Sequence, residues 1–249
     1  MASRIEVRQL THEDIDGAIH AIQDAFMDDP YFKWIYPDMK TFNRERNFQS
    51  LKNRYLWGME QGLFYVAREI TPAFPGDEKN PPRPETAKVV GVSSWLPPHP
   101  LSEGMTWSMW WSDWKLSFRQ LVTNARYMGR GGLNVHRYHI WKEVQDEAIK
   151  EDWTDKRGYY FCNVIAVSPG QQGKGIGKAL IKVVTDRADE EGLHCYLESS
   201  KQYPNLAIYE KFGFETVKEI TCRDEKDYCT LWCMVRPPVN PESKKKEKI

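Results

Sequence analysis

The sequence predicts a single α/β domain in which a mixed β-sheet carries helices on both faces. Runs typical of strands, with alternating or continuous apolar residues, are interleaved with longer runs whose apolar residues recur at helical spacing. A glycine-rich turn near residue 172 joins an apolar strand to an amphipathic helix. The 249 residues suffice for one large core, and we assign residues 1–236 to one domain.

The N-terminal part is expected to run strand, helix, helix, strand. Residues 5–10 alternate apolar and polar side chains, which is typical of a half-buried strand. Apolar residues at helical spacing then predict a helix that ends near Met27, because Asp28-Asp29-Pro30 would break it. A second helix is expected over 42–61, and a strand follows at 63–67.

The middle of the chain is expected to contain a helical insertion. A proline-rich loop at 71–84 should join the preceding strand to an antiparallel neighbour at 88–96. Residues 101–156 then show helical patterns separated by glycines at 129–132. Because neither end of this segment has a clear linker, we interpret it as an insertion between two strands of the sheet.

The C-terminal part is expected to contain a strand, a helix, a strand, a short helix and two closing strands. Their ranges are 159–167, 176–190, 194–199, 205–212, 214–221 and 229–236. Residues 237–249 include Lys244-Lys245-Lys246, and we expect a disordered basic tail, with a nuclear address as the alternative.

Composition excludes several classes of protein. The 35 basic residues balance 35 acidic ones, which argues against a nucleic-acid partner. No stretch reaches the ~20 apolar residues that cross a bilayer, and the N-terminus lacks a signal-peptide core. We therefore expect a cytoplasmic protein without a membrane partner. Five cysteines without a CxxC pair suit buried thiols better than disulfides or a metal site.

The glycine-rich turn is the most informative segment. Gly173, Gly175 and Gly177 stand at alternate positions where a helix opens. Glycines let the backbone approach a ligand closely, and the free N–H groups of a helix start attract phosphate. The spacing matches neither a Walker loop, because Ile176 replaces its lysine, nor a dinucleotide fingerprint, because Lys178 replaces its third glycine.

Instead, the turn fits the pattern Q-x-x-G-x-G from Gln172 to Gly177, behind a strand ending Val164-Ile165-Ala166-Val167. This resembles motif A of the GCN5-related N-acetyltransferase (GNAT) superfamily. Asn205 to Phe214 is similar to that family's N-x-x-x-Y-x-x-x-G-F segment, and Ala25 to Pro30 to the end of its first helix. The resemblance implies a GNAT-like sheet that splays at its centre.

The resemblance also implies acetyl-CoA as co-substrate. No metal is expected, because the histidines and cysteines lack the spacing of metal ligands. The pyrophosphate would bind backbone N–H groups of the turn and the helix start: Gln172, Gly173, Lys174, Gly175, Ile176, Gly177 and Lys178. The pantetheine arm would pair with the strand residues Ile165, Ala166 and Val167. Asn205 would contact the pantetheine region or cap the short helix.

Tyr209 matches the general acid of the family, since a phenol can protonate the departing thiolate. The general base is left open, because the strand before the turn contains no acidic residue. Glu198, near the end of the next strand, is our first candidate, although a charge at a strand end is an equally good interpretation. Asp28, Asp29, Glu147 and a water chain are weaker alternatives.

Four tryptophans, Trp107, Trp110, Trp111 and Trp114, fall on one helix face. One interpretation is that this stripe docks its helix onto the sheet. The other is that Trp110 and its neighbours join Phe26, Tyr31, Phe32 and Trp34 in an acceptor pocket, where ring faces would bind a cationic amine.

The expected function is transfer of an acetyl group from acetyl-CoA to a primary amine of a small molecule, by direct attack. The alternative is a non-catalytic acyl-CoA-binding sensor or interaction module, and the third hypothesis is acetylation of protein lysines or N-termini. A hydrolase is disfavoured, because His194 and Glu198 share a strand face but no G-x-S-x-G elbow accompanies them. The acceptor and the oligomeric state stay open.

Overall fold

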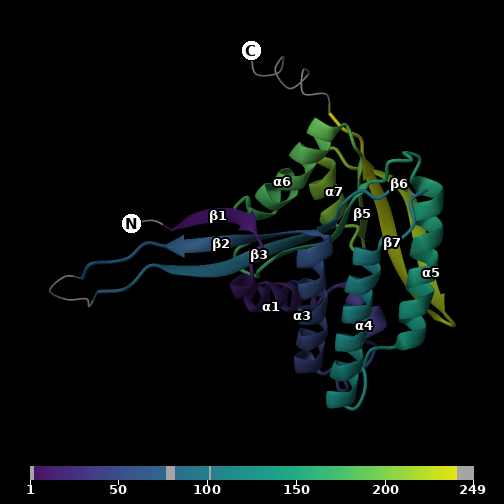
Figure 1. Cartoon of the computed structure of the whole chain (residues 1–249), viewed down its shortest axis with the longest axis horizontal. Coiled ribbons are helices and arrows are strands. Elements are labelled where there is room, and N and C mark those ends of the chain that lie inside the picture. Colours follow the sequence, from purple (N-terminus) through teal and green to yellow (C-terminus); the bar gives the residue numbers. More distant parts are fainter. Residues whose placement is uncertain (1–2, 77–81, 101, 240–249) are drawn as a thin grey trace.

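The computed structural model describes residues 3–76, 82–100 and 102–239 of the chain. Seven strands form one sheet in the order β1-β2-β3-β4-β5-β7-β6 (Figure 1). The strands are β1 (Arg4–Gln9), β2 (Leu63–Thr71), β3 (Thr86–Leu96), β4 (Tyr160–Val167), β5 (Cys195–Ser199), β6 (Glu215–Asp224) and β7 (Asp227–Arg236). The expected tail at 240–249 lies outside the described residues.

The sheet is mixed, as the sequence predicted. Neighbouring strands pair antiparallel except for β4 and β5, which are parallel. The parallel pairing covers only Tyr160 to Cys162 on β4, after which the two strands separate. The sheet therefore splays at its centre, on the C-terminal half of β4.

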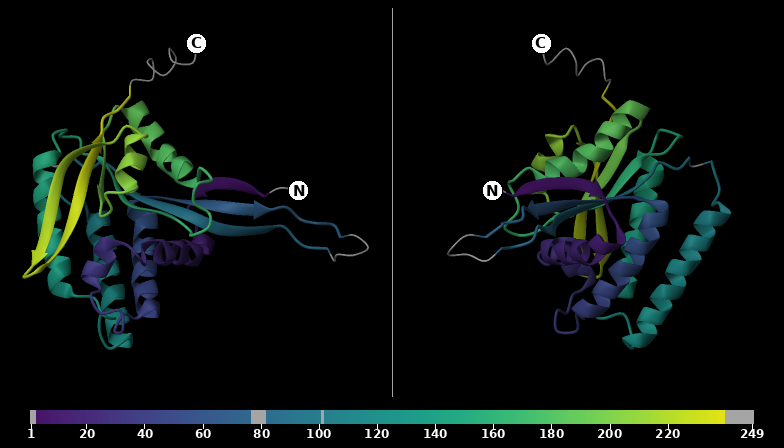
Figure 2. Two further views of the ribbon diagram at one scale, coloured as in Figure 1. Left: turned by 180° about the vertical axis from the view of Figure 1, so that it is seen from behind. Right: turned by 60° about the vertical axis from the view of Figure 1, so that its left-hand side comes forward.

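Helices cover both faces of this sheet (Figures 1 and 2). Their bounds are α1 (Ile15–Phe26), α2 (Pro30–Ile35), α3 (Arg44–Gln61), α4 (Trp107–Arg126), α5 (Val135–Asp152), α6 (Ile176–Glu191) and α7 (Asn205–Glu210). Helix α1 packs on β3 and β4, α5 on β6, and α2 on β7, while α6 packs across β1 to β4 from the other face.

The two faces are built from alternating side chains of the same strands. On β2, Val66 belongs to the apolar cluster under α1, whereas its neighbour Ala67 belongs to the cluster under α6. Both side chains are fully buried. This two-residue period places α1 and α6 on opposite sides of one sheet.

The segment Asp28-Asp29-Pro30 starts a helix as well as ending one, which the sequence interpretation missed. The Asp29 side chain accepts a hydrogen bond from the Phe32 N–H, and Pro30 occupies the first turn of α2. An acidic N-cap followed by proline is a helix-start signal, because the missing proline N–H needs no partner there. Strand β2 also continues beyond the expected end, to Thr71.

The insertion between β3 and β4 contains α4 and α5, as expected, but α4 does not dock onto the sheet through its tryptophans. Trp107, Trp110, Trp111 and Trp114 leave 47–83% of their surface exposed. Helix α4 packs instead on α3, through its opposite face. The docking interpretation of the tryptophan stripe is therefore wrong.

Candidate active site

The turn between β4 and α6 has room beside its backbone. Gly170, Gly173 and Gly175 have φ angles of 81°, 78° and 79°, which side chains other than glycine adopt only with strain. A Cβ added at any of the three would have no neighbour within 4 Å. The backbone of this turn is therefore open to a ligand that approaches closely.

The start of α6 offers free backbone donors. The N–H groups of Ile176, Gly177 and Lys178 make no hydrogen bond to the backbone of the described residues. The first such bond joins the Ala179 N–H to the Gly175 carbonyl, at 3.0 Å. Donors of this kind and the positive end of the helix dipole form a seat for an anion.

Two lysines lie on this turn but differ in their contacts. The Lys174 ammonium donates to Gln171 Oε1 at 2.7 Å, and Gln171 in turn donates to Glu69. Lys178 is exposed on the first turn of α6. Both add positive charge near the free N–H groups, and Gln172 is exposed beside them.

The C-terminal half of β4 has a free edge. Ile165, Ala166 and Val167 pair with β3 on one side, but β5 has already separated from β4 on the other. Unpaired strand groups of this kind can bind an extended ligand as an added strand. The edge leads from the gap between the strands to the turn that starts α6.

Tyr209 lies on α7, in the apolar cluster that packs between the sheet and α6. Its ring contacts Phe214 with centroids 6.1 Å apart, and burial raises the pKa of its hydroxyl. Cys162, the last β4 residue paired with β5, is close enough to raise that pKa further, as is Asp29. The phenol is thus held in its protonated form beside the point where the strands part.

Asn205 ties α7 to the end of β5. Its Nδ2 donates to Ser199 Oγ at 3.3 Å. Pro204 occupies the N-cap position without any side-chain capping bond, so Asn205 does not cap the helix as one alternative proposed. The neighbouring Ser200 hydroxyl donates to Asp29 at 2.5 Å, and this bond joins the start of α2 to the end of β5.

Glu198 points to the other face of β5. The Gln145 side chain on α5 donates to its Oε2 at 2.8 Å, and the Tyr196 hydroxyl donates to its Oε1 at 3.1 Å. Burial raises the pKa of this carboxyl, and the two donors and Lys142 lower it to a smaller extent. A raised carboxyl pKa is what a general base near neutral pH requires.

The weaker candidates for the base have other environments. Asp28 is exposed and paired with Lys33 at 3.0 Å, a contact that lowers its pKa and makes it a poor proton acceptor. Asp29 is buried and occupied by the α2 N-cap and by Ser200. Glu147 is exposed on α5. Glu198 is the carboxylate whose environment best suits the role.

The structure divides the expected acceptor pocket. Tyr31 meets Trp141 of α5 with ring centroids 5.1 Å apart, and burial raises the pKa of its hydroxyl. Trp34 is buried beneath Arg137, with 5.6 Å from the guanidinium to the ring. Phe26 packs instead in the cluster between α1 and α3. Tyr31 and Trp34 thus belong to one apolar cluster, and Phe26 belongs to another.

Trp110 lies apart from all three. Its ring contacts are with Trp107 and Trp111 on the exposed face of α4. We therefore remove it from the acceptor site.

Three residues that contact Glu198 escaped the sequence interpretation: Gln145, Trp141 and Tyr196. Gln145 is separated from Glu198 by 53 positions, so no local pattern could connect them. Tyr196 carried a usable signal, because it stands two positions before Glu198 on a strand and must share its face.

Other kinds of site find no support in the described ranges. No group of three or more His, Cys, Asp or Glu side chains there could hold a metal ion. None of the helices in these ranges combines the length and apolar character needed to span a bilayer. All five cysteines are buried free thiols, as expected.

Comparison with known proteins agrees with this geometry. The model of the acetyltransferase (GNAT) family matches residues 93–214, which contain the turn and α7. An uncharacterized N-acetyltransferase of Schizosaccharomyces pombe, C550.08, is 30% identical over 239 residues, covering 95% of this chain and 83% of the relative. A second from the same yeast, C56E4.07, is 29% identical over 108 residues, or 42% of this chain and 45% of the relative.

A solved structure shares the fold. The Corynebacterium glutamicum protein described as histone acetyltransferase HPA2 and related acetyltransferase superposes with a TM-score of 0.51. The two are 18% identical, and the match covers 97% of this chain and 99% of the bacterial one. The 30% identity to C550.08 extends over nearly the whole chain, and the family model matches the glycine turn. Both findings confirm the resemblance inferred from the sequence, and the chain belongs to the acetyltransferase (GNAT) family.

Proposed function

We propose that the protein transfers an acetyl group from acetyl-CoA to a primary amine of a small molecule, by direct attack and without an acyl-enzyme. The observation that carries the proposal is the gap between β4 and β5. The two strands separate after Cys162, with the anion seat on one face of the sheet and the buried carboxylate of Glu198 on the other.

The donor fits on the α6 side. The positive-φ glycines leave the turn open, and the free N–H groups of Ile176, Gly177 and Lys178 suit a pyrophosphate. The free edge of β4 from Ile165 to Val167 suits an extended pantetheine arm. Bound in this way, acetyl-CoA supplies an activated acyl carbon at the gap.

The chain's own groups then move the protons. The bound ammonium first releases one proton to solvent, and Glu198 then accepts the second proton, which the amine nitrogen loses as it bonds to the acyl carbon. Tyr209 donates its hydroxyl proton to the sulfur as the carbon–sulfur bond breaks. The amide and the free thiol leave, and solvent returns a proton to Tyr209 and takes one from Glu198, so the cycle balances.

A compact acceptor suits the other face of the gap. Glu198 lies beneath α5, which brings Gln145 and Trp141 to it, and the Trp141 ring in turn contacts Tyr31. Aromatic faces and a carboxylate together favour an ammonium group before it is deprotonated. Helix α5 covers this side, which favours a small molecule over a folded protein surface.

The first test is free-thiol release from acetyl-CoA with small primary amines and with lysine-containing and N-terminal peptides. We expect turnover with small amines, and a Tyr209→Phe variant with kcat reduced by about 100-fold or more and little change in acetyl-CoA affinity. Tyr203→Phe, an exposed tyrosine just before α7, is the matched control. Unchanged turnover in Tyr209→Phe would remove the acid role.

The second test is the pH dependence of kcat/KM. Because burial raises the pKa of Glu198, the acid limb should lie above the ordinary glutamate pKa of about 4.3. Glu198→Gln should abolish this limb and most of the rate, whereas exposed Glu215→Gln should preserve both. A normal acid limb in Glu198→Gln would assign the base elsewhere.

The same assays separate the other hypotheses. Thermal stabilisation by CoA without thiol release from any amine would show a binding module. Preferred turnover of peptides over small amines would show a protein acetyltransferase.

A further inference from the structure

Helix α4 exposes its apolar face and packs with its polar face, which is the reverse of an ordinary surface helix. The face that packs on α3 is largely polar. Trp57 Nε1 donates to Asp113 at 2.7 Å, Asn53 Nδ2 donates to Thr123 Oγ1 at 2.9 Å, and the Ser112 hydroxyl donates to Glu60. These contacts satisfy the polar side of α4 within the molecule.

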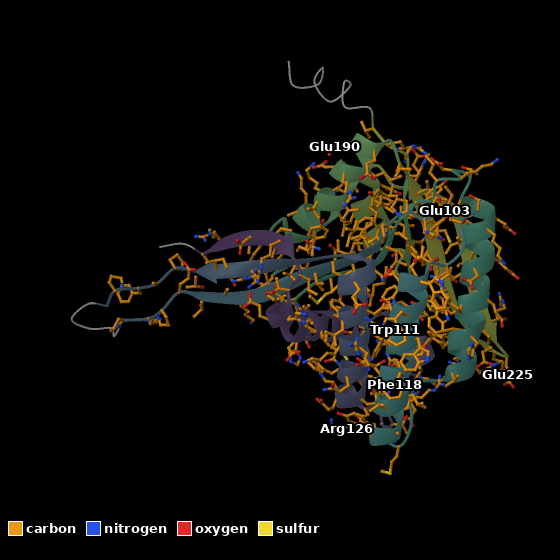
Figure 3. All side chains as sticks on the ribbon, in the orientation of Figure 1. Glu103, Trp111, Phe118, Arg126, Glu190 and Glu225 are labelled. Atoms are coloured by element: carbon orange, nitrogen blue, oxygen red, sulfur yellow. The ribbon has the colours of Figure 1, made fainter. Side chains whose placement is uncertain are left out.

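The opposite face of α4 carries large apolar side chains. We call these residues the α4 seam: Trp107, Trp111, Trp114, Phe118, Leu121, Ala125 and Met128. Every one of them is exposed, and Met128, just beyond the helix, is 96% exposed. Figure 3 labels Trp111 and Phe118 along this helix, and α4 forms an outer edge of the molecule in the right-hand view of Figure 2.

The seam has the spacing of a coiled coil. Its residues are separated alternately by four and three positions, which is the heptad pattern of a helix that packs against another helix. Only Lys115 is charged among the positions that flank the seam, and it is neutralised by Glu60 at 2.6 Å. The seam is thus an unpartnered helix-packing surface within the part of the chain that the structure describes.

The seam is also preordered. Trp111 and Trp114 stack with centroids 5.2 Å apart and planes 9° apart, and Trp114 stacks on Phe118 at 5.6 Å and 7°. Rings fixed before association lose little conformational freedom when they are covered.

We propose that the α4 seam pairs with the α4 seam of a second copy of this chain, as an antiparallel helix pair about a two-fold axis beside Leu116. In this register each seam residue before Leu116 faces the residue equally far after it in the other copy. Trp114 then faces Phe118, Trp111 faces Leu121, and Trp107 faces Ala125.

The seam complements itself in this register. The largest side chain, Trp107, meets the smallest, Ala125, and the two flat rings of Trp114 and Phe118 meet at the axis. A two-fold interface requires this kind of self-complementarity, because the same surface supplies both sides. In the antiparallel direction the bulky end of each helix meets the small end of the other, whereas a parallel pair would place the tryptophans of both copies against one another.

The area agrees with a specific contact. An aromatic side chain buries ~150–250 Å² when it is fully covered, so the four aromatic rings of the seam, which are about half exposed or more, leave roughly 500 Å² per chain. These rings are Trp111, Trp114 and Phe118, at 47–53% exposed, and Trp107, at 83%. Two copies would cover about 1,000 Å², the lower bound of specific interfaces.

The test is sedimentation velocity of the full chain over a concentration series. We expect a dimer for the wild-type protein, and a dissociation constant about 100-fold higher or more for Trp111→Lys/Phe118→Lys, because the pair would bury unpaired charges. Val217→Lys, which places one such charge on a similarly exposed apolar site of β6, should dimerise normally. Helix content from circular dichroism checks that each variant folds.

Cross-linking tests the register. A mixture of Trp107→Cys and Ala125→Cys proteins should form the mixed disulfide dimer on oxidation, and the five buried natural thiols should not compete. Disulfides only between identical variants would overturn the antiparallel register.

A monomer at every concentration would overturn the proposal. So would a dimer whose dissociation constant is unchanged in Trp111→Lys/Phe118→Lys. A monomer that floats with anionic lipid vesicles would assign the seam to a membrane surface instead. None of these outcomes depends on catalysis, so the proposal stands or falls separately from the acetyl transfer.

Discussion

Helices α6 and α4 are both amphipathic, but they place their apolar faces in opposite environments. On α6, Leu180 and Val184 are 0% exposed against the sheet, and the polar side faces solvent. On α4, the apolar side faces solvent and the polar side packs on α3. The difference shows that a periodic pattern determines which residues share a face, but not what that face meets.

The first prediction concerns the functional end of α6. Gly175→Glu should abolish acetyl-CoA binding, because a carboxylate at this open position would lie where the pyrophosphate is expected. Isothermal titration calorimetry measures the loss.

Gly192→Glu is the matched control for that prediction. Gly192 ends the same helix, also in the left-handed region at φ 65°, and an added Cβ would also meet nothing within 4 Å. It therefore introduces the same strain and charge at the other end of α6, and binding should persist. Normal binding by Gly175→Glu would place the donor elsewhere.

The second prediction compares the two apolar faces directly. Leu180→Ala should lower the free energy of unfolding by about 2–5 kcal/mol, because it leaves a cavity in a packed core. Trp111→Ala removes a larger side chain, yet it should cost about 1 kcal/mol or less in dilute protein, since its ring is half exposed. Urea unfolding measures both. Equal losses of stability would show that the tryptophan face of α4 is buried like the apolar face of α6, which would contradict the comparison.

The third prediction concerns the polar attachment of α4. Asp113→Ala leaves the partly buried indole N–H of Trp57 without its acceptor and should cost about 1 kcal/mol. Asp146→Ala on α5, whose partner Lys142 is also exposed, should change stability by about 0.5 kcal/mol or less. If Asp113→Ala matched this control, α4 would be held by something other than its polar face.

The smallest expected effect is a pH dependence of that attachment. Hydrogen bonds from Lys115 and Ser112 lower the pKa of Glu60. A carboxyl whose folded pKa is lowered contributes stability above its unfolded pKa and loses it as pH falls through the folded value. Glu60→Gln should thus be slightly less stable than wild type at pH 7 and equal to it in strong acid. A difference that grows in acid would contradict the assignment.

Much of the geometry on the proposed donor side could be predicted because its signals are local. The strand ending at Val167, Gly173 and Gly175 with their positive φ angles, and the start of α6 follow one another in the sequence, whereas Gly177 lies within α6. Asp29 and Pro30 show that a local signal can also be misread, since the same pair ends one helix and starts the next.

The proposed acceptor side could be predicted only in part. Glu198 was a candidate from its place on a strand, but its raised pKa depends on burial under α5, and its hydrogen bond comes from Gln145, which lies 53 positions away. Phe26 and Tyr31 are neighbours in the chain, yet they belong to different apolar clusters.

The sequence by itself determined the α/β class, the glycine turn and which residues share a face of each helix. These features depend on the period of the side chains and on backbone freedom within a few residues. Only the tertiary structure decided that β4 and β5 part after Cys162, that α5 covers Glu198, and that the tryptophans of α4 face outward. The physical reason is that burial is a property of the surroundings: a side chain loses water only when another element, placed by the whole chain, arrives to cover it.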